Sequence, residues 1–221
     1  WHAGDSVVMQ KTVSLCKGAG IAVGAHPGYP DLMGFGRRAL SVTPAEMKSY
    51  IMYQVGALQA FLRAEGMTLQ HVKPHGAMYN AAAKDIKLSR AICEAIAECA
   101  PGAILLCLSG SEMCRAAEEC GILYAREVFA DRAYEDDGSL VARSKPGAVI
   151  TDENEAIARV VRMVRESKVT SVNGKDISIK ADSICVHGDN AHALEFVTKI
   201  RAALEAESIS TAPLGDVISG R

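Results

Sequence analysis

The sequence predicts an α/β protein, and within that class a TIM-like (β/α) barrel with up to seven strands. Short apolar segments typical of buried parallel strands alternate about six times with longer segments that have helical apolar periodicity. Polar residues follow nearly every strand, and a histidine with a glycine one or two residues later recurs there at His2, His26, His75 and His187. A doubly wound sheet gathers such residues at one switch point, whereas a barrel has them at the end of every strand. The distribution therefore favours the barrel.

The length of 221 residues is usual for one α/β domain, so we expect a single (β/α) barrel domain over residues 1–221. The first residues, Trp1-His2-Ala3-Gly4-Asp5, have the pattern that follows strands elsewhere in the chain. We therefore expect one further strand of the barrel N-terminal to residue 1.

Composition excludes several classes of function. The net charge is −2, the pI is near 6.3, and no basic stripe with interleaved aromatic residues occurs, which argues against a nucleic-acid partner. No apolar run reaches 18 residues, which argues against a membrane span. The seven cysteines include no Cys-x-x-Cys pair, so we expect free, mostly buried thiols in a reducing compartment rather than disulfides or a zinc ribbon.

The first elements in chain order have clear start and stop signals. A helix is predicted from its N-cap, Asp5, to the glycines at 18 and 20, and a strand is predicted at 21–25. Thr43-Pro44-Ala45-Glu46 is a capping box with proline at the first helical position, and an apolar stripe then runs to Gly66. The glycine-rich loop between strand and helix is a weak phosphate signal, because no third glycine and no helix follow Gly34-x-Gly36.

The later elements continue the alternation. We expect a polar loop without a helix at 130–144, with a turn rather than a calcium site at Asp136-Asp137-Gly138. A hairpin is predicted at 169–179 with its turn at Asn173-Gly174, and the tail at 214–221 carries no recognisable signal. The remaining elements are strands at 69–72, 103–108, 122–129 and 183–186, and helices at 84–99, from Asp152 to about 164, and at 191–206.

The polar residues at the strand ends indicate hydrolysis or acyl transfer. Histidine acts as a general base near neutral pH, aspartate orients it, and lysine or arginine holds a carboxylate or an oxyanion. His71 lies inside a strand and is interpreted as a core residue, and Asp5 and Asp189 fit equally well as helix caps. If the strand ends share one crevice, the candidates for it are His2, His26, Lys73, His75, Asp131, Arg132, Arg143, His187 and Asp189.

Metal and nucleotide motifs are absent from the sequence. No His-Glu-x-x-His or His-x-His occurs, so we assign no residue to a metal and leave metal binding open. The chain also contains no phosphate-binding Gly-x4-Gly-Lys-Ser/Thr, no kinase loop set and no Gly-x-Ser-x-Gly elbow. Neither ATP binding nor a serine nucleophile is therefore predicted from motifs.

Seven motifs in a fixed order cover the chain to about Ile209. They are Trp1-His-Ala-Gly-Asp5, Gly24-Ala-His-Pro-Gly-Tyr-Pro-Asp31, Gly34-Phe-Gly-Arg37, Val72-Lys-Pro-His-Gly76, Tyr79-Asn80, Glu127-Val-Phe-Ala-Asp-Arg132 and Val186-His-Gly-Asp189. Together they strongly resemble the LamB/YcsF family, whose members form the A subunit of the prokaryotic ATP-dependent 5-oxoprolinase. The chain departs from the family at its start, where family members carry a strand that ends in an Asn-Ala-Asp-Leu-Gly-Glu-like segment.

The resemblance implies a barrel of the glycoside hydrolase/deacetylase type in a cytoplasmic enzyme. This enzyme opens the lactam of 5-oxo-L-proline to L-glutamate with ATP hydrolysis, and it works with partner subunits B and C. A lactam amide is stable and needs activation by ATP. Since this chain lacks a nucleotide motif, ATP is expected to bind wholly or partly to the partners, and the A subunit is expected to activate water and open the ring.

Under this hypothesis the general base is His75 or His187, and Asp189 or Asp131 orients it. Lys73 with Arg37, Arg132 or Arg143 is expected to hold the substrate carboxylate or phosphate. The full set implied to bind substrate is His2, His26, Asp31, Arg37, Lys73, Tyr79, Arg132 and Arg143.

Two alternative functions remain open on the sequence alone. One is a stand-alone, metal-dependent amide or N-acyl hydrolase on the same barrel. The other is a non-catalytic scaffold that binds substrate and partner subunits.

Overall fold

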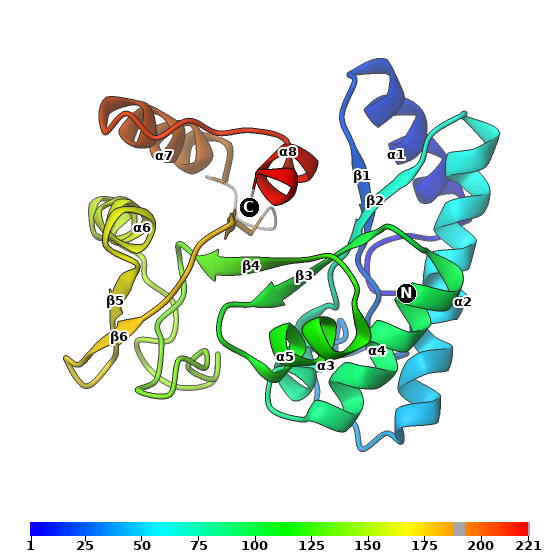
Figure 1. The fold of residues 1–221 in the computed structure, drawn as a ribbon, viewed down its shortest axis with the longest axis horizontal. Helices are drawn as coiled ribbons and strands as arrows, with labels where there is room; N and C mark the ends of the chain where they lie inside the picture. The colour runs from blue at the N-terminus through cyan, green and yellow to red at the C-terminus, as the bar shows by residue number, and fades with distance from the viewer. Residues whose placement is uncertain (188–192, 221) are drawn as a thin grey trace. The chain divides into compact units, whose positions relative to one another are not determined.

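The computed structural model describes residues 1–187 and 193–220 (Figure 1). The chain divides into two compact units. Unit 1 consists of Trp1–Cys107 and Glu112–Tyr124, and unit 2 consists of Leu108–Ser111 and Ala125–Arg221. Each unit combines parallel strands with helices, so the predicted α/β class is confirmed.

Three parallel strands form the sheet of unit 1. They are β1 (Val23–Ala25), β2 (Leu69–Val72) and β3 (Ile104–Leu108), in the order β1-β2-β3. Ala25 pairs with Val72, and Val72 pairs with Leu105, so the carboxyl ends of β1 and β2 lie beside each other. Every residue of β3 is buried, as expected of a strand whose two faces are covered by helices.

The helices of unit 1 begin where the local signals predict. Asp5 caps the first of them by accepting a hydrogen bond from the Val8 amide at 2.8 Å, and both halves of the Thr43/Glu46 capping box form. The second helix contacts both the first and the fourth (Figure 1). The five helices are α1 (Ser6–Gly18), α2 (Pro44–Ala64), α3 (Gly76–Ala82), α4 (Ile86–Cys99) and α5 (Glu112–Cys120).

Unit 2 contains a parallel strand pair and an antiparallel hairpin. The parallel pair is β4 (Tyr124–Phe129) and β7 (Ser183–Cys185), with Phe129 opposite Cys185. The hairpin is β5 (Lys168–Thr170) and β6 (Asp176–Ser178), and its turn holds Gly174 at a φ of 79°, as the Asn-Gly pair predicts.

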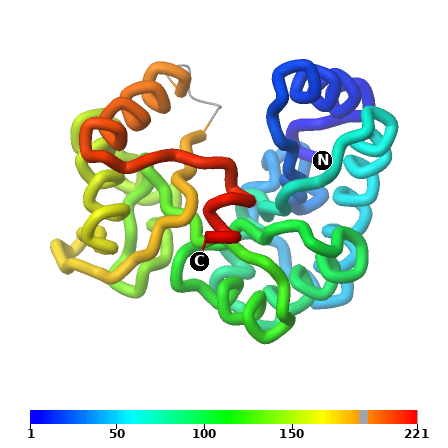
Figure 2. The backbone as a smooth tube through the Cα atoms, turned by 45° about the horizontal axis from the view of Figure 1, so that its top comes forward, coloured from blue at the N-terminus to red at the C-terminus, as the bar shows by residue number. Residues whose placement is uncertain are grey.

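Two helices pack together in unit 2, α6 (Glu153–Glu166) and α7 (Ala193–Ala206), and they lie side by side in Figures 1 and 2. Val160 of α6 and Phe196 of α7 belong to one buried apolar cluster. The tail forms a further short helix, α8 (Leu214–Ser219), which the sequence did not indicate. Residues 191–192, where α7 was predicted to begin, lie outside the described residues.

Among the described residues, the parallel strands are β1, β2 and β3 in unit 1 and β4 and β7 in unit 2, and β5 and β6 form the hairpin. Closure of the parallel strands into a barrel stays a prediction. None of the described helices has the length and apolarity needed to cross a membrane. Of the seven cysteines, four are buried and three are half-buried.

Candidate active site

Three histidines come together in unit 1. His26 follows β1, His75 is the N-cap residue of α3 after β2, and His2 lies in the segment before α1. The His2 and His75 rings stack with centroids 3.6 Å apart, and Nδ1 of His75 lies 3.0 Å from Nε2 of His26. One ring nitrogen from each residue falls within a group whose members are all within 4.8 Å of one another.

Backbone carbonyls orient two of these rings. Nδ1 of His26 donates to the Lys73 carbonyl oxygen at 2.6 Å, and Nε2 of His75 donates to the Phe35 carbonyl oxygen at 2.8 Å. A carbonyl oxygen only accepts, so both of these nitrogens carry the proton. The nitrogens that face each other, Nε2 of His26 and Nδ1 of His75, are therefore lone-pair nitrogens when the imidazoles are neutral.

The cluster favours neutral histidines. Burial, followed by the charge of His75, lowers the pKa of His2 to about 4. The pKa of His26 is lowered to about 3. The largest cause is burial of the ring among protein atoms, followed by the charges of Lys73 and His75, although part of the residue is open to solvent. Both residues are therefore uncharged at neutral pH. A neutral imidazole can accept a proton or bind a metal ion, whereas a protonated imidazole can do neither.

The loop after β1 is held against the cluster by residues that the sequence analysis did not select. The Gln54 side chain of α2 is buried, accepts from the Gly28 amide at 2.9 Å and donates to the Gly28 carbonyl at 3.0 Å. Gly36 has a φ of 65°, and a Cβ there would lie 2.9 Å from the His75 ring. The glycines of this loop therefore allow close approach to His75 rather than forming a phosphate cradle. The signal for Gln54 was a polar residue beside an apolar helix stripe.

The predicted substrate-binding residues of unit 1 differ in their surroundings. Asp31 is buried, accepts from the Gly34 amide and pairs with Arg38, whose hydrogen bond keeps the pKa of the carboxyl below its usual value. Asp31 thus closes its own loop. Tyr79 is buried within α3, and the Arg37 guanidinium lies over the Phe35 ring at 5.1 Å from the centroid. Substrate contact by these residues stays a prediction.

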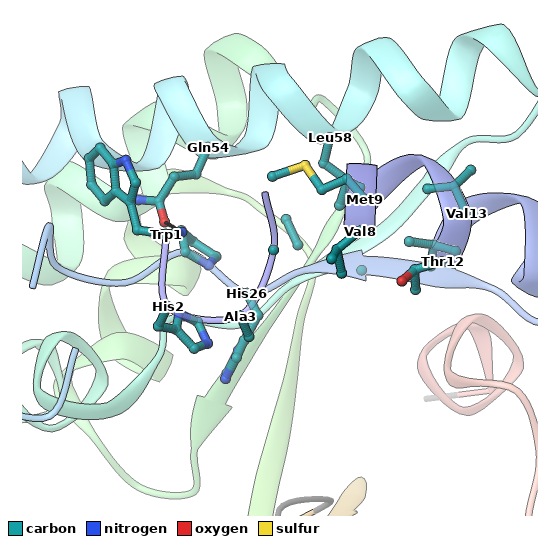
Figure 3. Close-up of a pocket in the computed structure, with 15 residues that line it drawn as sticks. Trp1, His2, Ala3, Val8, Met9, Thr12, Val13, His26, Gln54 and Leu58 are labelled. Atoms are coloured by element: carbon teal, nitrogen blue, oxygen red, sulfur yellow. Dashed lines mark hydrogen bonds between the residues drawn. The ribbon is translucent and has the colours of Figure 1, made fainter. Parts of the chain in front are cut away.

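A cavity of about 270 Å³ lies beside the cluster, between the N-terminal segment, α1, α2 and β1 (Figure 3). His2, His26 and Gln54 line part of it, and most of the wall is apolar, including Val8, Met9 and Leu58. The third histidine, His75, is not part of this wall.

A second cluster occurs in unit 2, where Asp131 follows β4 and His187 follows β7. Nδ1 of His187 donates to the Asp131 carboxylate, at 2.9 Å from Oδ2 and 3.1 Å from Oδ1. The opposite nitrogen, Nε2, accepts a hydrogen bond from Nη2 of Arg143 at 3.0 Å. The proton is thus fixed on Nδ1, and Nε2 carries the lone pair that a general base needs.

Asp131 is ionised in this arrangement. Burial raises the pKa of its carboxyl, but the hydrogen bond and charge of His187 and the charge of Arg143 outweigh burial, and the pKa lies below its ordinary value. An ionised carboxylate on Nδ1 stabilises the imidazolium that forms when His187 takes a proton. The pair has the geometry of an oriented base.

Arg132 and Asp189 are the other residues that the sequence analysis selected from this part of the chain. Arg132 is buried, and its guanidinium donates to the carbonyl oxygens of Val141 at 2.5 Å and Ala148 at 3.2 Å, so it holds the 130–150 loop together. Asp189, the alternative orienting residue, lies outside the described residues. The expectation that all candidates share one crevice concerns residues of both units and stays a prediction.

The fold and these clusters define an α/β protein with histidines and acidic or basic partners at strand ends, a set suited to proton transfer and hydrolysis. The chain belongs to the LamB/YcsF family, whose family model matches residues 1–219. The resemblance drawn from the seven motifs is therefore confirmed.

Relatives with curated names are similar over nearly the whole chain. The A subunit of a 5-oxoprolinase from Clostridium beijerinckii is 63% identical over 214 residues, which cover 97% of this chain and 84% of the relative. A protein of the same name from Thermococcus onnurineus is 56% identical over 99% of this chain and 86% of the relative. The crystal structure of a lactam utilization protein from Thermus thermophilus matches with a TM-score of 0.86 and 43% identity, over 95% of this chain and 84% of that one.

Proposed function

We propose that this chain is the A subunit of an ATP-dependent 5-oxoprolinase and takes part in the hydrolytic opening of 5-oxo-L-proline to L-glutamate. The observation that carries the proposal is the 63% identity, over 97% of the chain, to a relative named as this component of 5-oxoprolinase. The oriented His187 supports it, because lactam hydrolysis needs a base to take a proton from the attacking water.

In this proposal His187 is the general base and Asp131 is the residue that orients it. Water adds to the activated lactam carbonyl while Nε2 of His187 takes its proton. The carbonyl–nitrogen bond then breaks, and the protonated His187 returns its proton to the ring nitrogen as the amine of glutamate forms. His187 is preferred to His75 because Nδ1 of His187 donates to a carboxylate, whereas Nε2 of His75 donates to a neutral carbonyl.

Arg143 is proposed to bind the carboxylate of the substrate. Its side chain is exposed and hydrogen-bonds to Nε2 of His187, so a substrate carboxylate that draws the guanidinium away frees the base at the moment of binding. Lys73 and Arg37 are further candidates for the carboxylate or for phosphate.

ATP and the partner subunits complete the proposal. The relatives are named as one subunit of a 5-oxoprolinase, which supports a multi-subunit enzyme. We assign ATP wholly or partly to subunits B and C, and place the complex in the cytoplasm. We also propose that the parallel strands belong to a barrel of the glycoside hydrolase/deacetylase type, as membership of the LamB/YcsF family implies.

The test measures glutamate formed from 5-oxo-L-proline by the protein, with and without candidate partner subunits and with and without ATP. The proposal predicts turnover only when partners and ATP are both present. Turnover of another amide without ATP would instead favour a metal-dependent hydrolase, and intact partner binding without turnover under any condition would favour a scaffold.

A further inference from the structure

Two lone pairs face each other in the histidine cluster of unit 1. With Nδ1 of His26 and Nε2 of His75 donating to backbone carbonyls, the nitrogens 3.0 Å apart are both acceptors. Two acceptors at this distance repel unless a proton or a cation lies between them. The arrangement therefore calls for a positively charged occupant.

We propose that His2, His26 and His75 form a binding site for one divalent transition-metal ion, with Zn²⁺ as the best match. Imidazole nitrogen is a ligand that Zn²⁺ prefers, and nothing in the trio offers the oxygen ligands that Ca²⁺ and Mg²⁺ require. A histidine that ligates a metal almost always donates its other N–H to a carbonyl or carboxylate, and both His26 and His75 do so.

The third ligand is available as well. Nδ1 of His2 is buried and has no hydrogen-bond partner within the described part of the chain. An unpaired buried ring nitrogen is costly, and ligation would satisfy it. His2 and His75 now stack with an interplanar angle of 7°, so the His2 ring has to turn about its Cβ–Cγ bond to point its lone pair at a shared ion.

The distances need only a small adjustment. Tetrahedral zinc with Zn–N bonds of about 2.0–2.1 Å places its ligand nitrogens about 3.3 Å apart. The three nitrogens lie within 4.8 Å of one another, and the closest two are 3.0 Å apart. Because His26 is open to solvent, a fourth position remains for water, the pattern of three protein ligands plus water that catalytic zinc sites have.

Two cations near the cluster will limit the affinity. The charge of Lys73 acts on His26, and the charge of Arg37 acts on His2. We therefore expect micromolar rather than subnanomolar binding of Zn²⁺. This inference does not depend on the proposed ring-opening reaction, since it concerns binding of the ion alone.

The experiment titrates metal-free protein with Zn²⁺ against a chromogenic chelator and records the visible spectrum with Co²⁺. We expect one ion per chain and the intense visible bands of tetrahedral Co²⁺. His26→Ala and His75→Ala should each weaken binding at least about tenfold. His71→Gln is the matched control, because His71 lies on β2 outside the trio, and it should bind Zn²⁺ as the wild type does.

Zn²⁺ should also raise the melting temperature of the wild type and of His71→Gln, but not of His26→Ala. This readout separates loss of the site from loss of the fold, because the unliganded melting temperatures are measured in the same runs. No saturable binding at micromolar Zn²⁺ would overturn the proposal and leave a bridging proton as the occupant. Binding unaffected by His26→Ala and His75→Ala would overturn the proposal equally. So would a near-ultraviolet sulfur-to-Co²⁺ band, which would place the ion on the buried thiols of Cys107 and Cys114, whose Sγ atoms lie 3.1 Å apart.

Discussion

Replacing Asp131 by asparagine tests the proposed base most closely, because it removes one charge and keeps the shape of the side chain. The carboxylate accepts from Nδ1 of His187 at 2.9 and 3.1 Å, and its charge stabilises the imidazolium formed during proton transfer. Unit charges about 4 Å apart interact by about 4 kcal/mol at an effective dielectric of about 20. The side chains of His187 and Asp131 are 23% and 19% exposed, so solvent screening reduces this to about 2–3 kcal/mol.

A loss of about 2–3 kcal/mol corresponds to about a 30- to 150-fold fall in kcat. The assay is steady-state glutamate formation by the complex with its partner subunits and ATP. Since Asp131 acts through His187, kcat should fall with little change in KM, and Asp131→Glu should recover part of the activity. Asp152→Asn is the control, because Asp152 caps α6 and asparagine caps a helix equally well. A kcat within about threefold of the wild type, or an equal loss in Asp152→Asn, would refute the assignment.

Three further predictions concern Arg143, Gly24 and His71. Arg143→Ala should raise KM for 5-oxo-L-proline at least about tenfold with a smaller effect on kcat, and an unchanged KM would remove Arg143 from substrate binding. Gly24→Ala should lower the free energy of unfolding by about 1–3 kcal/mol, because its Cβ would overlap the His71 ring. The control is Gly56→Ala, at an open position of α2, which should raise the melting temperature instead. Burial lowers the pKa of His71 to about 4, so the unfolded chain takes up a proton below pH 6.5 that the folded protein does not. The contribution of His71 to the free energy of unfolding should fall by about 2–3 kcal/mol as the pH drops from 6.5 to 4. Urea titrations should therefore find the total fall smaller by about this amount in His71→Gln.

The fold was predictable wherever the signal is local. The Thr43/Glu46 capping box, the Asp5 and Asp152 caps and the Asn173-Gly174 turn all form as predicted, because each depends on residues within one turn of chain. The tail helix α8 was missed because its N-cap residue, Pro213, makes no side-chain capping hydrogen bond and none of its residues is buried. Little in its local sequence marks it as a helix.

The sequence predicted which residues belong to the candidate site but not which of them contact each other. The rule that strand ends carry chemistry selected His187 and Asp131, yet 56 residues separate them, and only the pairing of β4 with β7 brings them together. The histidine trio was missed as a group for the same reason. Its members lie in three different segments of the chain, so no ligand spacing exists in the sequence.

The role of His187 as the base is measured by glutamate formation in complexes that carry His187→Gln or His75→Gln, with both partner subunits, ATP and 5-oxo-L-proline. We predict that His187→Gln lowers kcat at least about 100-fold, as loss of a general base does. Circular dichroism of both variants should match the wild type, which assigns the loss to chemistry rather than to folding. A loss of about tenfold or less in His187→Gln would contradict the assignment of His187 as the base. The same small loss in both variants would also contradict the role proposed for this chain in opening the ring.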